Sequence, residues 1–299
     1  MNLIKLTNEC YYFDAPVNIG YVHHGEKGML IDAGIDDSVM RKALKQLAEK
    51  NLPITHLFIT HAHADHYGGA SFLQKSHRIH TMAPIFEAAI LANPTLEPLY
   101  LFSGNEPLPE LNNKFLQGKA IQVDQTLDEG DHEVDGFTFK TYLLPGHSYR
   151  QLAMEIGGIL YAGDSYFSED QLYKHKIPYI TEASLTIESL YKLLDVSCDG
   201  AVPGHGIFEK EFKSTVKKNI TYHEELLGWL YDEIKSHANG ISHESVVANM
   251  CEHYGVQSPG LSQWLLYRTA ATAYLVGLIK HKKISHTIKS SKWIFHADT

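Results

Sequence analysis

The chain has 299 residues, 44% of them hydrophobic, which is enough to bury the core of one large domain with or without a smaller appendage. Its formal net charge of −9 disfavours a general nucleic-acid binder, because such a protein needs a basic face to neutralise phosphates. The 3 cysteines are too few and too scattered for a disulfide framework or a CxxC centre.

The N-terminal stretch, MNLIKLTNEC, lacks the charged, apolar and cleavage regions of a signal peptide. No apolar run along the chain is long enough to span a membrane. These two features predict a cytoplasmic protein without a membrane partner.

The first two thirds of the chain alternate strand-like runs with helix-like segments. Strands are expected in LIKL, VNIGYVHH, GMLIDAG, HLFITH, AIQV, FTFKTYLLPGH, QLAMEI, GILYAGD and GAVPGHG, several of which are apolar throughout. Helices are expected over 37–51, with Asp37 or Ser38 as the N-cap, and in GGASFLQKS, APIFEAAILAN and IESLYKLLDV. This alternation predicts a layered α/β fold with helices outside the sheets.

Residues 93–118 have a different composition, with four prolines among several large apolar side chains. Such a segment suits an ordered excursion over a site better than a disordered linker, so we expect a lid here. Residues 170–185 are expected to form a solvated loop. Lys174 and Lys176 in this loop would meet an anionic substrate if the loop runs near the site.

After about residue 218 the pattern becomes helical. Helices are expected in TYHEELLGWLYDEIKSH, in SHESVVANMCEHYG, which opens with a capping serine, and in LSQWLLYRTAATAYLVGLIKHKK. The last stretch, ISHTIKSSKWIFH, predicts two short strands about a turn at 289–291. The order helix, helix, helix, hairpin is that of a winged helix. We therefore expect a catalytic domain over 1–218 and a helical, winged-helix-like subdomain over 219–299.

The last of the expected helices is apolar around much of its circumference, so another surface must cover it. Packing over a functional cleft and packing against a second copy in a homodimer would both do so. Basic residues in the last third of the subdomain hint at nucleic acid. The subdomain as a whole is neutral, however, and this helix is too apolar to read a groove.

The string THAHADHYGG places His61, His63, Asp65 and His66 within six positions. At the histidine and aspartate frequencies of this chain, such a string would arise by chance in roughly one chain in 250. It follows the strand HLFIT, whose end is where a parallel sheet presents functional residues. His61 and His63 point the same way along an extended strand end, and a turn then brings Asp65 and His66 to a neighbouring point.

Three further candidate ligands each follow an apolar strand and a glycine, which lets the backbone come close to an ion. They are His147 in LLPGHS, Asp164 in LYAGDS and His205 in AVPGHG. Imidazole and carboxylate ligands suit Zn²⁺, and also Fe²⁺ or Mn²⁺, whereas Ca²⁺ and Mg²⁺ prefer more oxygen. Seven ligands are enough for two metal sites.

In this order, the seven residues and the segments MLIDAG, PGHS and AGD resemble the metallo-β-lactamase superfamily of binuclear metallohydrolases over residues 1 to about 215. The resemblance implies an α/β fold, a four-layer αββα sandwich, with the site at one edge between the sheets. It implies that one metal, expected to be zinc, is bound by His61, His63 and His147. The second is then bound by Asp65, His66 and His205, and Asp164 bridges the two.

The function implied by the resemblance is hydrolysis of a small ester, thioester or lactone by a metal-bridging hydroxide, as in the hydroxyacylglutathione hydrolase and lactonase branches. Asp65 is also placed to carry a proton to the leaving group. Asp32 is either a carboxylate that orients a ligand histidine or a turn residue. Tyr166 is either a group that binds an oxyanion, as in the lactonases, or a wall of the pocket.

Other activities of the same superfamily are alternatives. A mononuclear iron persulfide dioxygenase would use His61, His147 and Asp164, and a metal count separates it from a binuclear hydrolase. A metal-dependent nuclease would act through the basic tail, but the chain has no inserted nuclease domain and no extended basic arm. The missing signal peptide disfavours β-lactam hydrolysis. Diiron electron transfer is disfavoured because this chain has a histidine at position 63. The superfamily members with that activity resemble each other in having a glutamate there.

Overall fold

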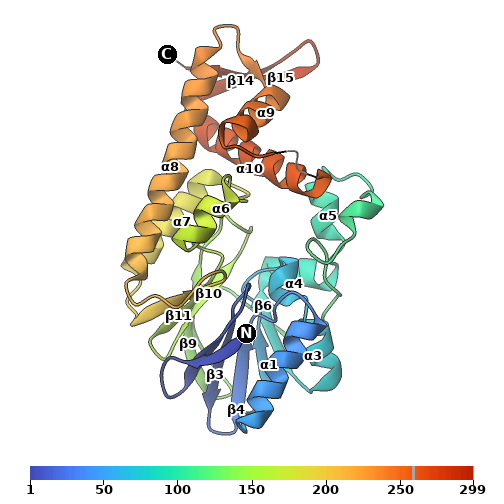
Figure 1. Cartoon of the computed structure of the whole chain (residues 1–299), viewed down its shortest axis with the longest axis vertical. Coiled ribbons are helices and arrows are strands. Elements are labelled where there is room, and N and C mark those ends of the chain that lie inside the picture. Colours follow the sequence, from blue (N-terminus) through green and yellow to red (C-terminus); the bar gives the residue numbers. More distant parts are fainter. Residues whose placement is uncertain (258–259, 299) are drawn as a thin grey trace.

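Two β-sheets stacked face to face make up the lower part of the molecule in Figure 1, a computed structural model that describes residues 1–257 and 260–298. The first sheet contains β1 (Asn2–Lys5), β2 (Cys10–Asp14), β3 (Ile19–His24), β4 (Lys27–Ile31), β5 (His56–Phe58), β6 (His80–Pro84) and β7 (Gln125–Leu127), in that order. The second contains β12 (Gly200–Pro203), β11 (Ile159–Gly163), β10 (Leu152–Ile156), β9 (Phe137–Leu143) and β8 (Gly130–Val134).

The two sheets each combine antiparallel and parallel pairs. β1 to β4 pair antiparallel, and β4 to β7 pair parallel. In the second sheet β8 to β11 pair antiparallel, and β12 pairs parallel with β11. Loops that follow β5, β11 and β12 therefore start from the carboxyl ends of parallel strands, which is where ligands bind in such sheets.

Helices cover the outer face of each sheet, which gives the αββα layers expected from the sequence. Alternating side chains along the strands make the layers: Leu57 and Ile59 belong to the core under the helices, whereas Phe58 lies between the two sheets. The first outer layer contains α1 (Asp37–Glu49), α3 (Ala70–Ser76) and α4 (Ile85–Ala92). The second contains α7 (Ala183–Asp195) and the first half of α8 (Phe212–Ser236).

The structure differs from the expected elements at several places, and the strands β2, β6 and β8 were not expected from the sequence. AIQV does not form a strand, and Gln125–Leu127 pairs with β6 instead. The N-cap of α1 is Asp36 rather than Asp37 or Ser38, because its side chain accepts hydrogen bonds from the Ser38 and Val39 amides. The expected loop at 170–185 begins with a helix, α6 (Glu169–His175), followed by an irregular segment.

The C-terminal elements follow the expected order. They are α9 (His243–His253), capped by Ser242, then α10 (Leu261–Lys280), β14 (Ile284–Lys289) and β15 (Lys292–Ala297). An unexpected short strand, β13 (Ile241–Ser242), pairs with β15. The expected boundary at 218 falls inside α8, which runs from the sandwich to the C-terminal helices in Figure 1. Among the described residues no helix is long and apolar enough to cross a membrane.

Residues 93–118 fold over the edge of the sandwich and contact the C-terminal elements. They contain α5 (Leu96–Leu101) and a 3₁₀ turn, η1 (Pro109–Leu111), and α10 contacts both. Figure 1 shows α10 running across the upper half of the molecule, below α9, towards α5. A small apolar cluster joins them, made of Leu101, Leu111 and Leu116 from this segment and Leu265 from α10. We call residues 93–118 the lid segment below.

Candidate metal centre

The seven predicted ligands come together at one edge of the sandwich. His61 and His63 follow β5, and Asp65 and His66 lie in α2 (Ala64–Tyr67), a single helical turn. The other three follow β9, β11 and β12. Their ligand atoms form three groups in which all atoms lie within 4.8 Å of one another: His61, His63 and His147; His61, His66 and Asp164; and Asp65, His66 and His205.

Hydrogen bonds on the outer ring nitrogens orient four of the five histidines. His61 Nδ1 lies 3.0 Å from Thr60 Oγ1, and His66 Nδ1 lies 2.8 Å from Asp32 Oδ2. His147 Nδ1 lies 3.0 Å from the Tyr179 carbonyl oxygen, and His205 Nδ1 lies 2.7 Å from the Pro16 carbonyl oxygen. These bonds on Nδ1 direct the Nε2 atom of each ring at the centre of the site, where Nε2 can bind a metal ion once it is unprotonated.

Several buried atoms at this centre are unsatisfied, and this fits a bound cation. Within the described parts of the chain His61 Nε2, His66 Nε2 and Asp164 Oδ1 are buried without a hydrogen-bond partner. His63 Nδ1 and His147 Nε2 face each other at 2.8 Å. Imidazole nitrogens that converge on carboxylate oxygens are the donor set that zinc prefers, so these residues fit one or more divalent metal ions.

The pKa values divide these histidines of the site into a neutral set and a protonated one. Burial lowers the pKa of His63 and His147 to about 4, and it lowers the pKa of His61 well below its ordinary value. These three are neutral at pH 7, as metal ligands must be. Burial also opposes a charge on His205, but the carboxylates of Asp164 and Asp65 raise its pKa to about 10. Without metal, a proton on His205 balances the two carboxylates.

Of the glycines before the later ligands, Gly204 lies directly against other candidate ligands. A Cβ atom on Gly204 would lie 2.0 Å from Asp164 Oδ1 and 2.8 Å from His66 Cε1, so any side chain there would displace two candidate ligands. Gly163, with φ +55°, turns the chain at the end of β11 so that Asp164 enters the site.

Asp32 lies on the far side of His66 from the cluster of candidate ligands, where a carboxylate can orient this histidine. Its Oδ1 accepts from the Thr60 amide at 2.8 Å, and its Oδ2 accepts from the Thr60 hydroxyl at 2.9 Å. The same Oδ2 faces His66 Nδ1 at 2.8 Å. The residue has φ 64°, a left-handed conformation that is costly for a side chain other than glycine.

Glu87, a residue that sequence reasoning passed over, joins two of the ligand loops. It is completely buried in α4, and its Oε2 accepts from the Ala62 amide at 2.9 Å, between His61 and His63. Its Oε1 accepts from the Ser148 hydroxyl and from the Arg150 amide, next to His147. The signal for it was present, since Glu87 is the one charged residue in APIFEAAILAN.

A cavity of about 480 Å³ opens on one side of the ligands. Its polar wall contains His63, Asp65, His147, Asp164 and His205, together with Lys174 and His175 from α6. Its apolar wall comes from Val17 and Ile35, from Phe115 and Leu116 of the lid segment, and from Leu266 of α10. The lid segment and the C-terminal elements thus both contribute to the space in which a substrate would lie.

Two residues proposed to meet the substrate lie elsewhere. The Tyr166 ring is 1% exposed and packs against Phe212 in the core between the second sheet and its helices, and it does not line the cavity. We therefore assign it no oxyanion-binding role. The Lys176 ammonium donates to the Gly255 carbonyl oxygen instead of lining the cavity.

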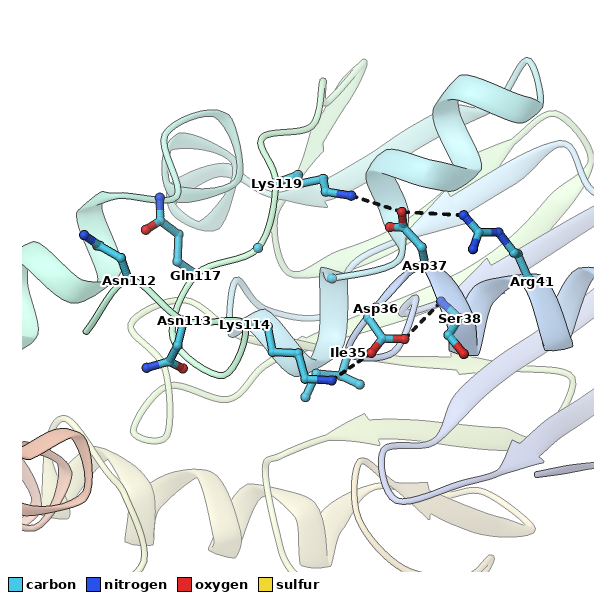
Figure 2. A pocket seen from close by; sticks show the side chains of 12 residues that line it. Ile35, Asp36, Asp37, Ser38, Arg41, Asn112, Asn113, Lys114, Gln117 and Lys119 are labelled. Carbon is cyan, nitrogen blue, oxygen red and sulfur yellow. Dashed lines mark hydrogen bonds and ion pairs between the residues drawn. The ribbon is translucent and has the colours of Figure 1, made fainter. Parts of the chain in front are cut away.

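Ion pairs fasten the end of the lid segment to the start of α1. Figure 2 shows Lys114 directed at Asp36 and Lys119 directed at Asp37, and the pairs measure 2.9 and 3.0 Å. The hydrogen bond from Lys114 lowers the pKa of Asp36. Phe115 and Leu116 lie next to Lys114, so these contacts hold the apolar wall of the cavity in place.

Comparison with known proteins agrees with this geometry. A family model described as the metallo-beta-lactamase superfamily matches residues 12–205. A lactamase-like protein, adaB, of Aspergillus niger is 24% identical over 209 residues, which cover 69% of this chain and 55% of that protein. An atrochrysone carboxyl ACP thioesterase of Emericella nidulans is 25% identical over 191 residues, covering 63% of this chain and 51% of that protein. The matches thus span about half the length of these relatives.

Two solved structures share the fold along nearly the whole chain. A beta-lactamase domain protein from Burkholderia ambifaria superposes with a TM-score of 0.75 at 16% identity and covers 99% of this chain and 94% of its own. A metallo-beta-lactamase family protein from Thermus thermophilus gives a TM-score of 0.72 at 17% identity, with 98% and 100% covered. The C-terminal elements are therefore part of the shared architecture.

Proposed function

Because the chain belongs to the metallo-beta-lactamase superfamily, we propose that it is a binuclear metal-dependent hydrolase of a small ester, thioester or lactone. The observation that carries the proposal is the convergence of all seven candidate ligands, in three overlapping groups, beside one cavity. A single metal ion would use only part of this set. The group of Asp65, His66 and His205 therefore favours two ions over the one iron of a persulfide dioxygenase.

Each metal is assigned its own ligands in this proposal. His61, His63 and His147 would hold the first ion, Asp65, His66 and His205 would hold the second, and Asp164 would be shared by both. Two zinc ions are the proposed cofactor, with iron or manganese as substitutes that the same donors would accept. When bound, such ions polarise a carbonyl group and lower the pKa of a shared water.

The protein residues supply binding and proton transfer. Asp65 lines the cavity, and its side chain is 28% exposed, so it can reach both a metal and a leaving group. We propose that it carries the proton to the leaving group. Lys174 gives the polar wall a positive charge that would attract an anionic part of the substrate.

A thioester is the favoured substrate within this class. The apolar wall would hold an acyl group of moderate size, and one relative is named an atrochrysone carboxyl ACP thioesterase. The proposed partner is therefore a small molecule rather than a nucleic acid. The C-terminal subdomain is proposed to cover the cavity through Leu266, and neither a homodimer nor the expected cytoplasmic location is needed for the proposal.

Metal analysis of protein purified without added metal is the first test, followed by hydrolysis of simple acyl thioesters and lactones. We expect about two zinc-like ions per chain and turnover that a chelator abolishes. His61→Ala and Asp164→Ala should lower the metal content and remove the activity. One iron per chain together with oxygen consumption on persulfides would overturn the proposal in favour of a dioxygenase.

A further inference from the structure

The cavity is also lined by the carboxyl group of Glu97, whose presence the metal centre does not explain. Glu97 lies in the first turn of α5 in the lid segment, is 6% exposed, and lines the cavity. Its Oε2 is buried without a hydrogen-bond partner among the described residues. Glu97 also belongs to none of the candidate ligand groups found in the described residues.

A carboxyl group in this position is costly for the free protein. Burial raises the pKa of Glu97 well above its ordinary value, and the charges of Asp65 and Glu87 raise it further. The cations that the lid segment places in ion pairs, Lys114 and Lys119, are directed at Asp36 and Asp37 and not at Glu97. A polar group that remains buried and unpaired in a native structure needs an explanation, and one that lines a cavity can be satisfied by a ligand.

Apart from Glu97, the side chains that the lid segment and α10 contribute to the cavity are hydrocarbon. The neighbours of Glu97 in the lid segment that line the cavity are Phe115 and Leu116, and Leu266 lines it from α10. A purely hydrocarbon acyl group would bury the carboxyl against carbon atoms and leave it unsatisfied. A group that can either donate to a carboxylate or accept from a carboxylic acid would satisfy it, and a hydroxyl group does both.

We propose that Glu97 is a specificity-determining residue that selects acyl substrates with a hydroxyl group remote from the scissile carbonyl. The proposal rests on the hydrolase function above and narrows its substrate class. A site that forms a hydrogen bond with a substrate hydroxyl discriminates against the substrate that lacks this hydroxyl. Such a substrate leaves the buried carboxyl group without a hydrogen-bond partner. Glu97 acts on the acyl chain, while the metal centre acts on the carbonyl.

Kinetics on paired substrates provide the first test. The probes are ω-hydroxyacyl thioesters of N-acetylcysteamine of increasing chain length, each compared with its unhydroxylated acyl partner. In the wild type, we expect kcat/KM for at least one hydroxylated thioester to exceed that for its unhydroxylated counterpart by about 10–100-fold. This is the range that one buried polar group without a hydrogen-bond partner produces. Glu97→Met should remove this preference mainly through KM, and Glu97→Gln should retain part of it. The exposed Glu110 of the same segment gives the control, since Glu110→Gln should behave as wild type.

Thermal unfolding provides a test that needs no turnover. If Glu97 is held for a ligand, Glu97→Met should raise the Tm of the free protein by a few degrees, because an unpaired polar group is removed without loss of volume. A lowered Tm would assign Glu97 a structural role and overturn the proposal. In the wild type, free ω-hydroxycarboxylic acids should raise the Tm more than the plain acids do, and Glu97→Met should abolish that difference.

The two measurements separate the two proposals. Absence of hydrolysis of every thioester, with the Tm differences as expected, would reject the hydrolase while leaving Glu97 as a hydroxyl-binding group. Efficient hydrolysis without any hydroxyl preference, with unchanged metal content in Glu97→Met, would reject the role of Glu97 and leave the hydrolase intact.

Discussion

Asp32 is the residue on which the orientation of His66 depends. It receives two hydrogen bonds from Thr60 and faces His66 Nδ1 at 2.8 Å, all within the buried interior. Loss of a carboxylate behind a ligand histidine typically weakens metal binding about 10–100-fold. We therefore expect Asp32→Ala to lower metal affinity by about that factor, measured by competition with a chromophoric chelator.

A second histidine and aspartate pair in the same protein provides the control. His56 Nε2 lies 3.0 Å from Asp135 Oδ2, away from the candidate ligands. Asp135→Ala should leave metal affinity unchanged. Equal losses in both variants would mean that general destabilisation, rather than the orientation of His66, explains the effect of Asp32.

Glu87 leads to a prediction about stability as well as activity. Its two oxygens accept three hydrogen bonds in a completely buried position, and each buried donor left unsatisfied costs about 1–3 kcal/mol. Glu87→Ala should thus lower the free energy of unfolding by about 3 kcal/mol or more. Urea denaturation of the metal-loaded protein measures this, and kcat/KM should fall with it because both ligand loops lose their anchor. Glu188→Gln, an exposed change on α7, should alter neither quantity.

At the scale of the element, the lid segment is predicted to bind substrate through Phe115. This side chain is 66% exposed and lines the cavity, so it stabilises the free protein little. Phe115→Ala should leave the Tm within a degree or two of wild type while raising KM for acyl substrates about tenfold, since a large apolar contact is lost. Ile288→Ala removes another exposed side chain, 73% accessible on β14, and should leave KM unchanged. A comparable KM increase in both variants would count against a substrate contact at Phe115.

The sequence failed to predict several short strands, among them β2, β6 and β8 with 5 residues each, and other elements without a detectable period. AIQV has a strand-like composition, yet Ile121 packs as a loop against the helical side of the first sheet, while the more polar Gln125–Leu127 forms the edge strand. In α6 only Leu172 is buried, so the helix shows no apolar face in its sequence. Long or strongly alternating segments such as α1, α8, β9 and the C-terminal hairpin were predicted because their patterns repeat several times.

At the scale of the whole molecule, the sequence predicted the roles of residues whose neighbours in the chain identify them. It did not predict the roles of residues whose partners lie far away in the sequence. The seven candidate ligands each follow a strand or a glycine, so their chemistry is visible in a few consecutive letters. Glu87 bonds to groups 25 and 61 positions away, and only the folded chain shows those partners. Glu97 enters the cavity because the lid segment folds over the sandwich edge, which no local pattern specifies.

The protonation states of the centre couple metal binding to the stability of the whole fold. In the metal-free protein His63 and His147 have a pKa of about 4 against an ordinary 6.5, so the unfolded chain binds more protons below pH 6.5 and stability falls as the pH decreases from there. His205 has a pKa of about 10, so its stabilising ion pairs are fully present below pH 6.5 and are lost as the pH rises towards 10. Taken alone, these groups place maximum stability of the metal-free protein near pH 6.5.

Bound metal should reverse the pH dependence of stability above pH 6.5. The ligand histidines must be unprotonated to bind a metal ion, so the ion displaces the proton of His205 and binds more tightly as the pH rises above 6.5. Ligand binding to the native state adds stability in proportion to the logarithm of the affinity. The Tm difference between metal-loaded and metal-free protein should therefore widen between pH 6.5 and about 9, as thermal unfolding of both forms at constant free zinc would measure. Parallel profiles for the two forms would mean that His205 does not exchange its proton for a metal ion, and the assignment of the second site would fall with it.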